Sequence, residues 1–359
     1  MSGRNMIKCV GMLMVVFMIF LMCGCKSKTE SVSVIDKEKS NDMIKIGFSM
    51  GTLQEERWQR DRDIFVARAK ELGADVIVQN ANNDNEEQMK QVKYLIEQGI
   101  DILLIVPHDA ERCGEIVQMA KKAGIKVISY DRLVKNAKAD LYISFDNVKV
   151  GELMAQALLK KVPAGNYIVL NGAETDNNSY MFRQGYMDTL ESHIARGDIK
   201  IVSEIWAKDW AHEDAFHCVE KALEEGKKID AIIGANDNLA SAAIEALSEK
   251  RLAGKVPVVG HDADLAACQR VAEGTQLMTA YKPIDKIAKA AAEIAIKMAK
   301  GEDVAANNTI NDGKYQIPYY MIEPVSVTID NMKDTVIHDS FHRLEDIYIN
   351  VPKSNWPVD

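Results

Sequence analysis

The hydrophobic residues of this chain are grouped in short runs that alternate with longer segments in which apolar and polar residues mix. Short runs rich in valine and isoleucine are typical of strands that are buried on both faces of a sheet. The predicted strands are 44–50, 76–81, 102–107, 126–131 and 141–146 in the first half of the chain, and 167–172, 199–207, 230–237, 256–264 and 277–283 in the second half.

The segments between these runs are predicted to be helices. In 86–98, for example, Met89, Val92 and Ile96 recur at the spacing of one helical face. Glycine follows each of the first three segments, at the point where a helix end favours a left-handed residue. The predicted helices are 56–72, 86–98, 111–123, 178–195, 211–225, 238–250, 264–273 and 284–300. This alternation indicates two successive α/β units, each with a parallel sheet that is covered by helices.

The N-terminal segment differs from the rest of the chain. Two basic residues precede the apolar run 9–24, which ends at Cys25. The run is shorter than the roughly 20 residues that a spanning helix needs, so it favours a secretory signal. The sequence MCGC around it resembles the lipobox of bacterial lipoproteins, with Cys25 as the lipid-attachment residue, although Met22 replaces the usual leucine. An uncleaved signal anchor is the alternative. Either interpretation places the chain beyond the polar tether 26–42 outside the cytoplasmic membrane.

Composition narrows the class of protein. The 359-residue chain is 47% hydrophobic and 27% charged, and it carries a formal charge of −9 without a long basic run. This balance is typical of globular domains and argues against nucleic acid as a partner. The cysteines after residue 43 are Cys113, Cys218 and Cys268. Because their number is odd and each lies in a predicted helix, free thiols are expected instead of a disulfide framework.

In open parallel sheets, ligands bind outside the carboxyl ends of the strands, so the residues that follow the strands are candidates for a site. These loops hold three cations, three carboxylates, amides and two tryptophans. Because the opposite charges balance, the set indicates a neutral sugar or polyol, bound by charged hydrogen-bonding groups and aromatic faces. The candidate binding residues are Arg57, Trp58, Asp131, Arg132, Asp176, Asn178, Trp210, Asn236, Asp262 and Lys282.

Each of these residues also has an ordinary structural explanation. Asp and Asn after a strand are common helix N-caps, and Arg132 or Lys282 could pair with a carboxylate at the surface. Trp210 could belong to the core. The ten residues together are stronger evidence for a site than any one of them, because every strand that ends at this edge of the sheets is followed by a hydrogen-bonding group.

Common enzyme motifs are missing from the sequence. It contains neither of the nucleotide-binding patterns GxGxxG and GxxxxGK[ST]. A glycosidase needs an acid with a raised pKa, whereas Arg and Lys neighbours are expected to lower the pKa of the cleft carboxyls. His338 and His342 have metal-ligand spacing but lack the glutamate of HExxH, so a solvated pair is the preferred interpretation. A binding protein without catalytic activity, cofactor or metal is therefore predicted.

Several separated stretches resemble one known family, the periplasmic sugar-binding proteins of the ribose, galactose and xylose group. The resemblance covers about residues 43–345, and it includes ERWQRDRDIFV (56–66), YDRLV (130–134), YISFDNVKVGELMA (142–155), TDNNS (175–179), GHDADLA (260–266), GTQLMTAYKPI (274–284) and KDTVIHDSFH (333–342). It implies the type I periplasmic-binding-protein fold, an α/β fold with two Rossmann-like lobes of parallel sheet joined by a three-strand hinge. The implied lobes are 43–146 plus 283–311 and 147–282 plus 312–351, with crossings near 145–147, 281–284 and 308–314.

The same resemblance, to the xylose-binding members in particular, implies the function. The protein would close on D-xylose or a similar monosaccharide, held by the ten candidate residues. It would then present the sugar to the permease of an ABC importer at the extracytoplasmic face of the membrane. The alternative is a xylose sensor that signals through the extracellular domain of a membrane histidine kinase of a two-component system. Residues 49–52 and His261 depart from the family pattern, which would adjust affinity or selectivity between pentoses.

Overall fold

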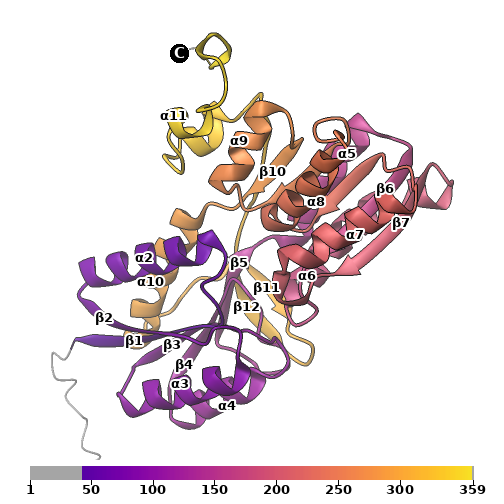
Figure 1. Ribbon diagram of the computed structural model, residues 1–359. Coiled ribbons are helices and arrows are strands. Elements are labelled where there is room, and N and C mark those ends of the chain that lie inside the picture. Colours follow the sequence, from indigo (N-terminus) through magenta and orange to yellow (C-terminus); the bar gives the residue numbers. More distant parts are fainter. Residues whose placement is uncertain (1–42, 358–359) are drawn as a thin grey trace, which may run out of the picture. The chain divides into compact units, whose positions relative to one another are not determined.

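The computed structural model describes residues 43–357, and Met43–Asp359 form one compact unit of the chain. This unit contains two α/β lobes, each built around its own sheet (Figure 1). The first sheet has the strand order β11-β12-β5-β4-β3-β1-β2, and the second has the order β13-β10-β9-β8-β6-β7. Most neighbouring strands run parallel, while β11–β12 and β10–β13 pair antiparallel at the sheet edges.

The first sheet is buried between two pairs of helices. Its strands are β1 (Ile44–Met50), β2 (Ala74–Asn80), β3 (Ile102–Val106), β4 (Lys126–Tyr130), β5 (Leu141–Phe145), β11 (Asn308–Asn311) and β12 (Gln316–Ile322). Helices α2 (Glu56–Glu71) and α10 (Ile284–Lys300) cover one face, and α3 (Asn85–Glu97) and α4 (Gly114–Lys122) cover the other. The sequence ILLIV of β3 is buried at every position because both faces of the strand meet helices.

The second sheet has the same layered construction. Its strands are β6 (Gly165–Asn171), β7 (Ile199–Trp206), β8 (Ala231–Gly234), β9 (Val258–His261), β10 (Met278–Tyr281) and β13 (Val325–Val327). Its helices are α5 (Asn147–Lys161), α6 (Asn177–Ala195), α7 (His212–Glu224), α8 (Asp237–Glu249) and α9 (Leu265–Glu273). The C-terminal segment, with α11 (Leu344–Ile347), packs through Val336 and Tyr348 on the cluster that contains Cys268 of α9.

The chain passes between the two sheets three times within residues 43–357. It leaves the first sheet after β5, returns to it between β10 and α10, and leaves again between β12 and β13. The last crossing therefore lies at 323–324, later than the predicted crossing near 308–314 and the predicted boundary at 311. The cause is the β11–β12 hairpin, which extends the first sheet by pairing β12 with β5.

Helix α5 has no counterpart among the helices predicted from sequence. Gly151 interrupts its apolar pattern, but the packing explains this glycine. A Cβ atom at Gly151 would lie 2.1 Å from the carbonyl oxygen of Phe182, and one at Gly185 would lie 2.0 Å from that of Val148. The two glycines therefore let α5 and α6 pack backbone to backbone.

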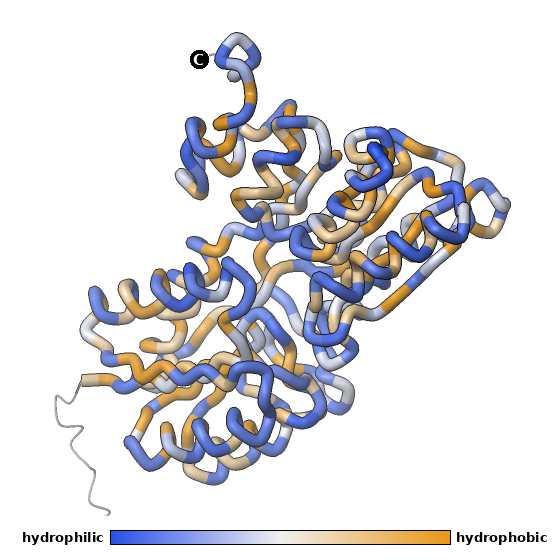
Figure 2. The backbone as a smooth tube through the Cα atoms, in the orientation of Figure 1, coloured by the Kyte–Doolittle hydropathy of each residue, from blue (hydrophilic) through white to orange (hydrophobic). Residues whose placement is uncertain are grey.

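Hydropathy follows these layers. Hydrophobic positions collect along the strands and the inner faces of the helices, and hydrophilic positions lie on the outer faces (Figure 2). Between residues 43 and 357, every helix is too short or too polar to span a bilayer. Cys113, Cys218 and Cys268 are free thiols, as predicted.

Candidate binding site

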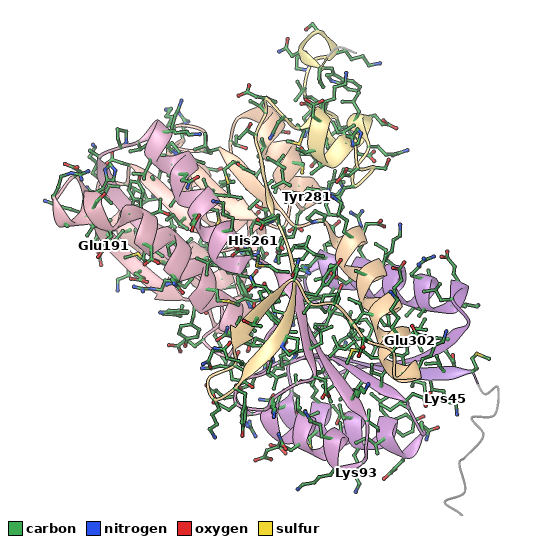
Figure 3. All side chains as sticks on the ribbon, turned by 180° about the vertical axis from the view of Figure 1, so that it is seen from behind. Lys45, Lys93, Glu191, His261, Tyr281 and Glu302 are labelled. Carbon is green, nitrogen blue, oxygen red and sulfur yellow. The ribbon has the colours of Figure 1, made fainter. Side chains whose placement is uncertain are left out.

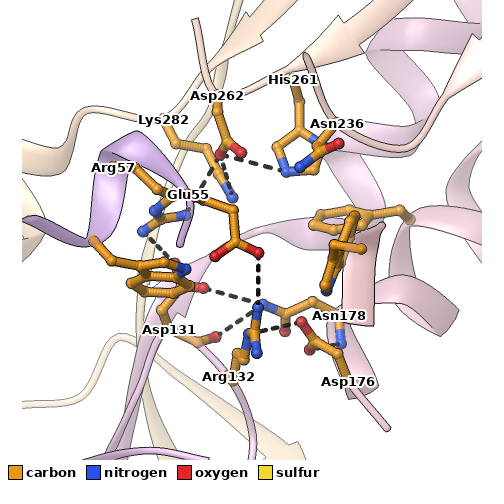
Figure 4. Close-up of a pocket in the computed structure, with 13 residues that line it drawn as sticks. Glu55, Arg57, Asp131, Arg132, Asp176, Asn178, Asn236, His261, Asp262 and Lys282 are labelled. Atoms are coloured by element: carbon orange, nitrogen blue, oxygen red, sulfur yellow. Dashed lines mark hydrogen bonds and ion pairs between the residues drawn. The ribbon is translucent and has the colours of Figure 1, made fainter. Parts of the chain in front are cut away.

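A pocket lies where the carboxyl ends of strands from both sheets face each other. All ten residues predicted from the sequence line it, together with Glu55, Phe182 and His261 (Figure 4). Seen from behind, His261 lies where the two lobes meet (Figure 3). Cys25, the predicted lipid-attachment residue, lies outside the described residues. The convergence follows from the fold, because parallel strands bring their carboxyl ends to one edge of each sheet.

The pocket residues come from separate loops of the two lobes. The first lobe supplies Arg57 and Trp58 from the first turn of α2, and Asp131 and Arg132 from the loop after β4. At the second lobe, Asp176 and Asn178 lie at the start of α6, and Trp210, Asn236, Asp262 and Lys282 follow strands β7, β8, β9 and β10 in that order. Asp176 also caps α6, accepting a hydrogen bond from the backbone N–H of Asn178 at 2.9 Å. Asn236 caps α8 in the same way, accepting from Leu239 at 2.9 Å. These two residues therefore cap helices and also line the pocket.

Arg57 is the centre of a buried network of ion pairs. Its guanidinium lies 3.2 Å from Asp61, 2.7 Å from Asp131 and 3.5 Å from Asp262. Lys282 pairs with Asp262 at 2.9 Å. Arg57 and Asp131 belong to the first lobe, whereas Asp262 belongs to the second. The network therefore bridges the two lobes.

A second bridge between the lobes involves Arg132. Its Nε lies 2.8 Å from a carboxylate oxygen of Asp176, and both side chains are buried. Beside it, Asn178 of the second lobe donates to the backbone carbonyl and the carboxylate of Asp131, each at 3.2 Å. Arg132 therefore pairs with a carboxylate inside the pocket. The alternative interpretation, that it pairs with a carboxylate at the protein surface, is wrong.

Two indole rings reach the pocket from opposite lobes. The guanidinium carbon of Arg57 lies 4.4 Å from the centre of the Trp58 ring, and that of Arg132 lies 5.2 Å from it. Trp210 packs edge-on against Phe182 at 6.4 Å. It has space only because residue 172 is glycine, where a Cβ atom would lie 2.2 Å from the indole. Aromatic rings from both lobes therefore line the pocket beside its charged groups.

Three pocket residues have left-handed backbone conformations, which side chains other than glycine rarely adopt. The φ angles are 58° at Asp131, 61° at Trp210 and 104° at Asp262. The surroundings hold these conformations in place. The carbonyl of Asp131, for example, accepts hydrogen bonds from the hydroxyls of Tyr142 and Ser144, both at 2.7 Å. Strain of this kind accumulates at ligand sites, where side chains must point in defined directions.

Several buried polar atoms at the pocket lack partners. In the described part of the chain, Glu55 Oε2, Trp58 Nε1 and Trp210 Nε1 are among the buried side-chain atoms without a hydrogen bond. Buried polar groups are normally paired, and leaving one unpaired costs about 1–3 kcal/mol. The two indole N–H groups, the Glu55 oxygen and the likewise unpaired Nδ1 of His261 are thus available to a polar ligand in this pocket.

Comparison with known proteins identifies the family. Residues 46–303 match the model of the periplasmic binding protein domain. The chain belongs to the periplasmic binding protein family. It is 45% identical over 319 residues to the D-xylose-binding periplasmic protein of Haemophilus influenzae, which covers 89% of this chain and 96% of that protein. The corresponding protein of Escherichia coli is 46% identical over 301 residues, or 84% of this chain and 91% of that one.

Solved structures agree with this assignment. A solute-binding protein of an ABC transporter from Clostridium phytofermentans, with bound β-D-glucose, superposes with a TM-score of 0.79 at 26% identity, covering 84% of this chain and 99% of that one. A carbohydrate-transporter binding protein from Chloroflexus aurantiacus, in complex with D-glucose, gives 0.78 at 27% identity over 85% and 98%. The predicted resemblance and fold class are confirmed, and the chain is a solute-binding protein and not an enzyme.

Burial and charge act in opposite directions on the carboxyls of this binding protein. Burial alone would raise the pKa of Asp131, but Arg57 and Lys282 bring it below its ordinary value. The pKa of Asp262 is lowered as well, because His261, Lys282 and Arg57 together outweigh its burial. At Asp176 burial outweighs Arg132, and the pKa is raised. The prediction that cationic neighbours lower the pKa of the cleft carboxyls is therefore wrong for Asp176.

Three lining residues were not among the ten candidates. Phe182 lies four residues after Asn178 on α6, so the helical spacing places both on one face, and this signal could have found it. His261 ends β9 and was noted only as a departure from the family pattern. Glu55 stands in a run of charged residues that resembles a solvated helix start, and nothing in the sequence distinguishes it from Glu56.

His338 and His342 do not form a solvated pair. The side chain of His338 is 77% exposed, but His342 is buried and its Nε2 donates to the carbonyl of Ala263 at 2.8 Å. Burial lowers the pKa of His342 to about 4, so the ring is neutral at physiological pH. No cluster of three metal-ligating side chains occurs in residues 43–357. His342 instead fastens the C-terminal segment to the loop that holds Asp262.

Two neighbouring carboxyls, the buried Asp237 and the partly buried Asp264, are expected to make stability depend on pH. Asp237 accepts from the hydroxyl of Thr279 at 2.8 Å and from the backbone N–H of Asp264 at 3.1 Å. Burial raises the pKa of Asp237 to about 7 and that of Asp264 to about 8, so the folded protein holds protons that the unfolded chain releases near pH 4. This contribution to stability is complete below pH 4 and is lost as the pH rises toward 8.

The melting temperature is expected to fall as the pH rises from 6.5 to 8.5. Burial lowers the pKa values of His261 and His342 to about 3 and about 4, so these rings do not titrate in this window. Scanning calorimetry of the parent and Asp264→Asn tests the prediction, with exposed Asp63→Asn as control. The melting temperature of Asp264→Asn should depend less on pH than that of the parent. Each proton that the folded protein holds and the unfolded chain releases changes the free energy of unfolding by about 1.4 kcal/mol per pH unit. A parent whose melting temperature is constant across this window would contradict the assignment.

Proposed function

We propose that the chain is an extracytoplasmic D-xylose-binding protein that closes on the sugar between its two lobes and presents it to an ABC importer. The observation that carries the proposal is the convergence of charged, amide and indole side chains from both sheets on one pocket. The identity of 45% and 46% to two D-xylose-binding periplasmic proteins supports xylose as the sugar.

The chemistry of the pocket suits a neutral polyhydroxylated ring. Guanidinium and carboxylate groups offer pairs of donors or acceptors in fixed planes, which match neighbouring hydroxyls, and the amides of Asn178 and Asn236 offer one of each kind. The indoles of Trp58 and Trp210 would cover the C–H faces of the ring. Each hydrogen bond to a charged group contributes about 1.5–3 kcal/mol. Several such bonds suffice for specific binding after the ordering costs.

Closure of the lobes would couple binding to transport. Arg57–Asp262 at 3.5 Å and Arg132–Asp176 at 2.8 Å join residues of different lobes, so the closed arrangement depends on groups that also line the pocket. A sugar that contacts both lobes stabilises the closed form only by its preference for closed over open. The closed protein would be the form that the importer recognises.

The proposal also concerns the membrane anchor of the protein and the membrane protein with which it interacts. We place the protein at the extracytoplasmic face, held there by a lipid on Cys25 or by an uncleaved signal anchor. Metabolic labelling with a lipid analogue, lost in Cys25→Ala, would support the lipid. A membrane histidine kinase is the alternative partner. Adjacent permease genes would support the importer, and an adjacent sensor kinase gene would favour the alternative.

Calorimetric titration with sugars tests the ligand. The full chain, kept in detergent because of its apolar N-terminal run, is titrated with xylose, ribose, arabinose and glucose. Saturable heat with xylose and weaker binding of the other three sugars is the expected result. Absence of heat with xylose, or tighter binding of another sugar, would contradict the proposal.

A further inference from the structure

Glu55 occupies an unusual position at the entrance of α2. It is the N-cap residue of the helix, where a short polar side chain normally accepts a hydrogen bond from the first turn. The side chain of Glu55 makes no such bond. It points instead toward the interior of the pocket, among the side chains of both lobes (Figure 4).

The carboxylate of Glu55 is held more weakly than the other charged groups of the pocket. Oε1 lies 3.7 Å from Arg132, beyond hydrogen-bond distance, and Oε2 is buried without a partner. By contrast, Arg132 holds Asp176 at 2.8 Å and Lys282 holds Asp262 at 2.9 Å. Glu55 can therefore leave the pocket without breaking a strong ion pair.

The space in the pocket shows that something must move before a sugar enters. With both lobes and Glu55 as they lie, only about 20 Å³ of the pocket can hold the centre of a water-sized molecule, which is room for about one water and not for a pentose. Glu55 also borders a larger groove of about 630 Å³ between the lobes, outside the pocket. The carboxylate thus lies between the pocket and a space that could receive it.

Electrostatics favour the inner position of Glu55. The outer groove has one lysine, Lys208, among several acidic side chains, whereas the pocket has three cations that balance its three other carboxylates. The acidic residues of the groove, apart from the protonated Asp264, are Glu56, Asp209, Glu213 and Asp214. A carboxylate that turns outward therefore moves from a neighbourhood with Arg132 to one of like charge, which opposes its departure.

We propose that Glu55 competes with the sugar, so that its carboxylate fills the space beside Arg132 and must turn outward before a pentose binds. Glu55 is then the residue that sets the affinity of the pocket. This inference rests on the proposed function, because it concerns the same site. A competitor that fills the pocket in most molecules lowers the apparent affinity in proportion to the fraction that remains open.

Removing the competitor is expected to strengthen binding, opposite to the effect of other substitutions in this pocket. Titration calorimetry of the full chain with xylose should give a dissociation constant about tenfold lower for Glu55→Ala than for the parent, as when a competitor fills about nine-tenths of the pockets. Glu55→Gln keeps the shape but loses the charge, so an intermediate gain is expected. It also tests the proposal if Glu55→Ala fails to fold.

Glu71→Ala is the matched control, because it removes the same charge from the far end of α2, where the side chain is 66% exposed. Its affinity should equal that of the parent. An unchanged or weaker affinity in both Glu55 variants would overturn the inference, since Glu55 would then be inert or a sugar contact. A parent and variants that all fail to bind xylose would count against the proposed function itself.

Discussion

Substituting alanine for Arg57 is expected to abolish measurable xylose binding and to lower the stability of the fold. Arg57 is 4% exposed and contacts carboxylates of both lobes. Without it, Asp131 loses its 2.7 Å partner and Asp61 keeps a hydrogen bond from Tyr130 but no cation. Removing one partner of a buried ion pair costs about 3–5 kcal/mol. The sugar would also lose charged donors, which lowers affinity by about 100-fold or more.

Two further variants separate charge from geometry at this position. Arg57→Lys keeps the positive charge but cannot hold three carboxylates in one plane, so binding should recover only in small part. Arg62→Ala is the control, because Arg62 lies on the same helix and pairs only with the exposed Asp63 among the contacts described for it. Circular dichroism and thermal melting check the fold of each variant before calorimetric titration. A Kd for Arg57→Ala within threefold of the parent value would show that Arg57 is a purely structural residue.

Apart from helix α5, the strands and helices of residues 44–300 were predictable, because buried parallel strands are apolar without interruption. ILLIV in β3 and AIIG in β8 are apolar throughout, since helices cover both faces of each sheet. The β11–β12 hairpin lacks this continuous apolar sequence. Asn308 and Thr309 are exposed in its outer strand, and Pro318 interrupts the inner one. Antiparallel pairing at a sheet edge leaves a mixed pattern, so the last crossing was predicted too early.

The site was predictable for a different reason. Once parallel sheets are assumed, topology alone brings the residues after their strands together, and no side-chain geometry is needed. Glu55 and His342 show the limit of that argument. Glu55 enters the pocket by turning inward at a helix start, and His342 is buried by a tertiary contact with Ala263. Both depend on packing between segments that are distant in sequence, which no local pattern records.

Trp58→Ala is expected to weaken xylose binding strongly while also costing stability. The indole is 2% exposed and packs in the cluster that contains Phe65 and Tyr130, so it belongs to the core as well as to the pocket. Truncating a buried aromatic residue costs about 3–5 kcal/mol. On the pocket side, the sugar would lose an apolar face and the unpaired Nε1 donor. Binding and stability are therefore both expected to depend on this residue.

The two contributions of Trp58 separate when affinity and stability are measured on the same variants. Trp58→Phe keeps most of the packing but removes the indole N–H, so its loss of affinity should exceed what its change in melting temperature would suggest. Trp206→Ala is the matched control. Trp206 stacks on Tyr180 at 4.6 Å but does not line the pocket, so its loss should lower the melting temperature and leave the Kd unchanged. If Trp58→Ala binds xylose as tightly as Trp206→Ala does, the indole serves only to anchor α2 on the core.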